Sequence, residues 1–106
     1  MKEPIEKALK LGGTELRFST FAVKAFYGFD LVRFVDDFSS PNSAYRKDAI
    51  FQIDVREVSK RTFTIGDIFT LKDNYFTYTF KLTNNPEPDF TGWAKLQASY
   101  TGKTAL

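Results

Sequence analysis

The side chains that could do chemistry in this 106-residue chain are paired carboxylates and a serine beside a lysine. Two carboxyl groups can act together as general acid and base, and the available pairs are Asp36 with Asp37 and Asp54 with Glu57. The acidic and polar segment 36–42 offers oxygen ligands, but it lacks the spacing and the central glycine of a calcium loop. Adjacent acids in a loop are ordinarily solvated, so neither pattern predicts a catalytic or metal site.

Other catalytic and nucleotide-binding patterns are missing as well. Ser59 and Lys60 are sequence neighbours whose side chains point in different directions, and no oxyanion motif surrounds them. The scattered glycines match no phosphate-binding fingerprint. The chain has no His and no Cys, which removes the commonest general base, thiolate nucleophiles and disulfides. We therefore expect a protein that is not an enzyme and that uses no cofactor and no metal.

The composition fits one soluble domain. Hydrophobic residues make up 42% and charged residues 26%, and the net charge of +2 is too small for a dedicated nucleic-acid binder. No apolar run approaches the roughly 18 residues that span a bilayer, and the first residues lack the apolar core of a signal peptide. We expect an intracellular single domain over 1–106, with a helical or extended segment at 1–13, a β domain at 14–100 and a tail at 101–106.

Alternation of apolar and polar residues predicts most of the elements. It is clearest over 75–82, where Phe76, Tyr78, Phe80 and Leu82 share one face and Tyr75 is the outward ring. Segments 49–56 and 93–100 alternate in the same way. A short helix is expected over 4–11, stopped by the glycines that follow.

The segments between these strands show turn signals. The run 14–27 changes its apolar phase, which predicts a strand with a bulge near Ser19. The segment 56–61 is expected to be a charged connection, and 72–74 a hairpin loop. The prolines of 84–89 are expected to bar strand pairing there. Together these features predict an all-β fold with minor α content, either a small antiparallel sandwich or a barrel, with a short N-terminal helix.

Two long connections, 28–48 and 83–92, are the expected places for function. Aromatic residues gather in the first, and aromatics clustered in loops often anchor interfaces, although the loop could instead fold back into its own core. Basic residues there could meet acidic partner surfaces or DNA phosphates. The candidate assembly residues are Phe29, Phe34, Phe38, Tyr45, Arg33, Arg46, Lys47, Glu87 and Asp89.

Segments 51–58, 63–71, 75–82 and 92–96 also carry a likeness to a known family. Through them the chain resembles the small head-to-tail joining, or head-completion connector, proteins of long-tailed bacteriophages and prophages. In that family a strand ends in a short charged turn, a Gly-Asp step opens the next strand, and a hairpin follows. The run Asn-Asn-Pro-Glu-Pro before the last strand departs from the family pattern.

The resemblance implies a structural virion protein whose copies form a ring between the capsid portal and the tail. Its implied partners are further copies of itself, portal or adaptor proteins and tail proteins, with non-specific contact to DNA in the channel and none to a membrane. The implied location is the virion, and the host cytoplasm during assembly. Two alternatives stay open: a tail-terminator or tail-tube-type subunit of the same machinery, and a small β-barrel that binds oligonucleotides.

Overall fold

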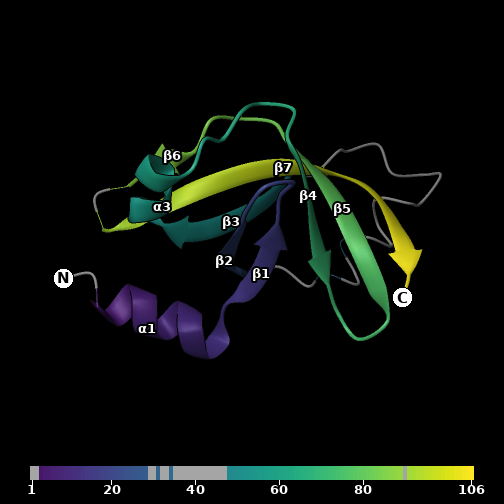
Figure 1. Cartoon of the computed structure of the whole chain (residues 1–106), viewed down its shortest axis with the longest axis horizontal. Helices are drawn as coiled ribbons and strands as arrows, with labels where there is room; N and C mark the ends of the chain where they lie inside the picture. Colours follow the sequence, from purple (N-terminus) through teal and green to yellow (C-terminus); the bar gives the residue numbers. More distant parts are fainter. Residues whose placement is uncertain (1–2, 29–30, 32–33, 35–47, 90) are drawn as a thin grey trace.

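The computed structural model describes residues 3–28, 31, 34, 48–89 and 91–106, with the backbone alone described for residues 3–6. The described residues form two short helices and seven strands, whose arrangement can be followed in Figure 1. In chain order they are α1 (Glu3–Gly12), β1 (Thr14–Arg17), β2 (Ala22–Tyr27), β3 (Ala49–Asp54), α3 (Val55–Lys60), β4 (Ile68–Lys72), β5 (Phe76–Leu82), β6 (Glu87–Pro88) and β7 (Trp93–Ala105).

Six strands close into an antiparallel barrel made of two three-stranded meanders. The first meander is β1-β2-β3 and the second is β4-β5-β7, and α3 connects them. The long strand β7 arches over the molecule in Figure 1 because its first half pairs with β3 and its second half with β5. The expected all-β fold with minor α content is confirmed, and of the two expected architectures the barrel is the one found.

The barrel interior is filled by aromatic and aliphatic side chains. Phe51, Phe69 and Phe80 are fully buried, and their ring centroids lie 5.3 to 5.6 Å apart. Stacked and edge-to-face contacts at this spacing are favourable beyond the area that they bury. The alternation in β5 is confirmed, because Tyr78 is buried with Phe80 whereas Tyr75 is 72% exposed.

The expected N-terminal helix is present as α1 and packs beside β2. Leu9 is its buried side chain, in agreement with the apolar spacing of the segment. The helix ends where the amide of Gly13 donates to the carbonyl of Leu9 at 2.7 Å. A Cβ atom at Gly13 would lie 2.5 Å from that same oxygen, so only glycine fits this tight exit from the helix.

The bulged strand expected over 14–27 is wrong: the segment is the hairpin β1–β2. The amide of Phe18 donates to the carbonyl of Phe21 at 2.8 Å across the turn, and the two rings stack at 4.8 Å. The chain reverses between these residues, so the apolar phase restarts in β2. A bulge and a short turn shift the phase alike, and the sequence pattern did not separate them.

The charged connection expected over 56–61 is also wrong, because α3 occupies it. Asp54 is the N-cap of this helix, and its carboxylate accepts a hydrogen bond from the amide of Arg56 at 2.9 Å. The strand expected to run to residue 56 therefore ends at Asp54. Phe51 and Ile53 point into the barrel as expected, whereas Val55 already belongs to α3 and is half-buried.

Two boundaries near the C-terminus differ from expectation. The segment expected as a tail over 101–106 continues β7 as far as Ala105, paired with the first half of β5. The proline-rich segment also pairs, since β6 lies against β7 with Pro88 opposite Ala94. Proline is tolerated there because β6 lies at the edge, outside the closed ladder, where a missing amide donor costs little.

Candidate functional site

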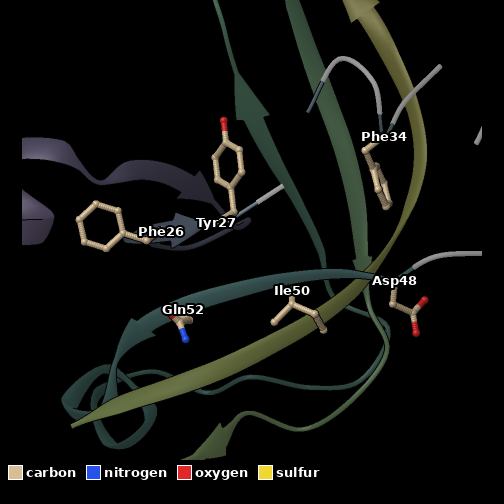
Figure 2. Close-up of a pocket in the computed structure, with 7 residues that line it drawn as sticks. Phe26, Tyr27, Phe34, Asp48, Ile50 and Gln52 are labelled. Atoms are coloured by element: carbon tan, nitrogen blue, oxygen red, sulfur yellow. The ribbon is translucent and has the colours of Figure 1, made fainter. Parts of the chain in front are cut away.

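An open hollow of about 410 Å³ lies where the chain leaves β2 and enters β3 (Figure 2). We term it the aromatic hollow. It is lined by Phe26, Tyr27, Gly28, Phe34, Asp48, Ile50 and Gln52. Figure 2 shows Phe26 and Tyr27 on one side of it and Phe34 with Asp48 on the other.

Strand alternation places the walls of the hollow. Ile50 and Gln52 lie on the outer face of β3 because Phe51 between them points into the barrel. Phe26 also lies on the outer face, 5.7 Å from the ring of Trp93. Ile50 keeps 36% of its surface exposed, so the hollow presents apolar side chains to solvent.

The aromatic rings of the hollow are held from within. Tyr27 lies 5.8 Å from the buried ring of Phe51, in an edge-on contact. Phe34 lies 6.5 Å from the ring of Tyr100 and packs against the core cluster. A rigid aromatic wall loses little conformational entropy on binding, which favours contact with apolar side chains of a partner.

The described polar side chains of the aromatic hollow are those of Tyr27, Asp48 and Gln52. Asp48 accepts a hydrogen bond from the side-chain amide of Gln97 at 2.6 Å, which fixes it at the rim. In the described parts of the chain no group of three His, Cys, Asp or Glu side chains could hold a metal ion. The chemistry that this site offers is therefore the burial of apolar surface.

A second depression of about 290 Å³ lies between α1, β2 and α3, and we term it the basic groove. It is lined by Leu9, Lys10, Ala22, Val23, Lys24, Asp54, Arg56, Glu57, Lys60 and Arg61. Asp54 is buried and accepts two hydrogen bonds from the Arg56 guanidinium at 3.1 Å and one at 2.6 Å. Glu57 pairs with Arg61 at 3.3 Å, so each carboxylate of the groove is held by its own arginine.

Two side chains of the hairpin β4–β5 have shifted pKa values. Asp73 accepts hydrogen bonds from the amides of Tyr75 and Phe76, both at 2.7 Å, which lower the pKa of its carboxyl group. It also accepts a hydrogen bond from the hydroxyl of Tyr78 at 2.7 Å. Burial, and then this hydrogen bond, raise the pKa of Tyr78 to about 12.

The free energy of unfolding is expected to fall as the pH rises from 10 to about 12. In this window Tyr78 keeps its proton in the folded barrel but loses it in the unfolded chain, so the unfolded state binds fewer protons. Denaturant titrations across the window, with tyrosinate absorption as a second probe, measure the effect. In Asp73→Asn the titration of Tyr78 is expected to move toward 10 without reaching it, because burial is the larger cause. A stability that is constant across the window would contradict this.

Three of the residues expected at an assembly interface lie in the described structure. Phe34 is half-buried and packs against the core cluster. Glu87 is exposed on β6, 3.5 Å from Lys95. Asp89 accepts hydrogen bonds from the amide and hydroxyl of Thr91 and closes a turn. The others lie outside the described residues: Phe29, Arg33, Phe38, Tyr45, Arg46 and Lys47.

The structure describes one of the two carboxylate pairs that the sequence offers. Asp54 and Glu57 each face a different arginine, and Asp36 with Asp37 lies outside the described residues. The basic groove is the site that the sequence patterns missed. Its signal was present, because an Asp followed three residues later by Glu is typical of a helix start, and a helix at this place brings its cations beside β2.

Comparisons with known proteins give this site no precedent. No family model matches the chain, and neither the curated proteins nor the solved structures contain a significant match. Among the described helices, none has the length and apolar character that crossing a membrane requires. The geometry of the two depressions is therefore the basis for assigning a function.

Proposed function

We propose that the protein is a structural subunit that forms a ring with copies of itself and joins the capsid portal to the tail of a phage or prophage particle. The observation that carries the proposal is the aromatic hollow. A closed barrel whose interior is filled by side chains offers only its outer surface for function. The hollow is the place on that surface where aromatic walls and an exposed Ile50 meet solvent.

A ring requires two unlike patches on each subunit, placed away from each other. The second patch that we propose consists of Ile65 and Ile68, which are 55% and 49% exposed, and we term it the β4 patch. In the barrel order β4 lies between β1 and β5 and has no ladder with β2 or β3. The two patches therefore lie on different walls, as head-to-tail contact demands. Burial of apolar area favours such a contact, and part of the gain is offset by the entropy that the subunits lose on association.

The ring is tested by size-exclusion chromatography with light scattering. The wild type is expected to elute at a multiple of 12.2 kDa. Ile50→Asp and Ile68→Asp are each expected to elute as a monomer, because each loses one patch and keeps the other. Mixed together, they are expected to form a dimer that cannot grow. Leu106→Asp, at an exposed position just after β7 that belongs to neither patch, is the control and keeps the wild-type mass.

A strict monomer at all concentrations would overturn the ring. If that monomer binds single-stranded DNA with a steep salt dependence, the oligonucleotide-binding barrel is the better assignment. If Leu106→Asp dissolves the ring as fully as the two isoleucine variants, added charge is the cause and the assigned patches are wrong.

A further inference from the structure

Three lysines from three different elements converge on the basic groove. Lys10 comes from α1, Lys24 from β2 and Lys60 from α3, and all three line the same depression. None of them takes part in an ion pair with another described residue. Like charges brought together on a surface repel one another and favour an anionic partner.

The carboxylates of the groove do not neutralise these lysines. Among the described side chains, the lining holds five cations and two carboxylates, and Asp54 and Glu57 are each paired with an arginine. Arg61 is further fixed over the ring of Phe21, with 5.3 Å between the guanidinium carbon and the ring centroid. The two arginines thus already form ion pairs within the chain, and the three lysines are the cations of the groove that can bind a ligand.

Part of one edge of β2 lies at the groove without a strand partner. On its β3 side, β2 pairs only through residues 25–27, because the chain turns into α3 after Asp54. Residues 22–24 line the groove and have no strand partner on that side among the described residues. An open strand edge can add an extended polypeptide through main-chain hydrogen bonds.

We infer that the basic groove binds an acidic, extended segment of a partner protein, which pairs with β2 at residues 22–24 and places its carboxylates among Lys10, Lys24 and Lys60. Main-chain pairing gives the segment its position, and the lysines select its charge. The inference goes beyond the proposed ring, since it concerns a different face of the barrel and holds whether or not a ring forms.

Nucleic acid fits the groove less well than a polypeptide. Single-stranded nucleic acid binds where aromatic side chains offer stacking platforms, and no aromatic residue is among those that line the groove. A strand edge pairs with another peptide backbone and has no counterpart in a sugar-phosphate chain. The groove therefore fits an acidic polypeptide better than a nucleic acid.

We assign the segment to another protein rather than to a second copy, because the carboxylates whose side chains the structure describes are already engaged. Every carboxylate whose side chain is described has a hydrogen bond or ion pair within its own chain. These residues are Glu15, Asp48, Asp54, Glu57, Asp67, Asp73, Glu87 and Asp89. A second copy would have to break such contacts to fill the groove.

The probe is a fluorescent peptide in which Glu and Thr alternate, and fluorescence anisotropy of the full chain measures its binding. The Glu peptide is expected to bind, and the same peptide with Gln in place of Glu is expected to bind at least about tenfold more weakly. In Lys24→Gln with Lys60→Gln the affinity for the Glu peptide is expected to fall by about tenfold. Backbone amide shifts are expected to move at residues 22–24.

The matched control is Lys72→Gln with Lys81→Gln, which removes the same charge from exposed positions on β4 and β5. It is expected to change the affinity by less than about threefold. Equal losses in both double variants would overturn the inference, as would amide shifts that avoid β2. If single-stranded DNA displaces the peptide, the groove is a nucleic-acid site. If the protein associates with itself without peptide, and only the groove variant loses this association, the occupant is a second copy of the chain. If the groove variant unfolds at the same temperature as the wild type, its loss of affinity for the peptide is not caused by unfolding.

Discussion

Phe80→Ala is expected to lower the free energy of unfolding by about 3 to 5 kcal/mol. The phenyl group of Phe80 is fully buried where the two meanders meet inside the barrel. Its centroid lies 5.3 Å from that of Phe51 and 5.6 Å from that of Phe69. Its removal leaves a cavity that the ladders β4–β5 and β5–β7 hold open, so the core cannot relax around it. Chemical denaturation followed by circular dichroism measures the change.

Tyr75→Ala is the control for the core prediction, because Tyr75 also belongs to the β4–β5 hairpin but is 72% exposed. It is expected to change the stability by less than about 0.5 kcal/mol. Equal costs for the two truncations would show that the direction of the alternation in β5 is not as described.

Asp54→Ala is expected to cost about 2 to 3 kcal/mol. The buried carboxylate both caps α3 and binds the Arg56 guanidinium, so one substitution removes a helix cap and a paired charge. Arg56 is about one third exposed, so water can solvate its charge, and the cost stays below the roughly 3 to 5 kcal/mol that breaking a fully buried pair costs. Thermal and denaturant unfolding give the measurement.

Glu57→Ala separates the buried pair from its exposed neighbour. The pair of Glu57 with Arg61 is partly exposed on the surface of α3 and is expected to contribute less than about 1 kcal/mol. If Glu57→Ala destabilises the fold as much as Asp54→Ala, the net charge of the groove matters more than the cap and the buried pair.

Strand alternation was the part of the fold that could be predicted from the sequence. It depends on one physical fact, that successive side chains of a strand point to opposite faces, and this placed Phe51, Tyr78 and Phe80 in the core. The same rule placed Ala94 and Leu96 of β7 inward. The rule says nothing about which strands are neighbours, so it could not predict the pairing of β3 with β7 that closes the barrel.

The two wrong predictions, at α3 and at the turn of the first hairpin, share a cause: short elements give weak periodic signals. The helix α3 has six residues and no buried side chain, so its two valines among charged residues give no clear helical pattern in the sequence. The turn of the first hairpin is flanked by two phenylalanines, which made it resemble a strand. The basic groove depends on both features, because α3 and the start of β2 are two of its walls. The groove was therefore missed together with these elements, although the spacing of Asp54 and Glu57 marked the start of α3.

The two-sided pairing of β7 also limits when the fold can form during synthesis. The strand closes both seams, against β3 and against β5, so the barrel cannot be completed until residues 93–105 have left the ribosome. Contacts between segments so far apart in the chain slow folding, because loop-closure entropy is lost before the pairing compensates for it. Until then the apolar inner faces of the first meander have no cover, and exposed apolar strand faces promote aggregation.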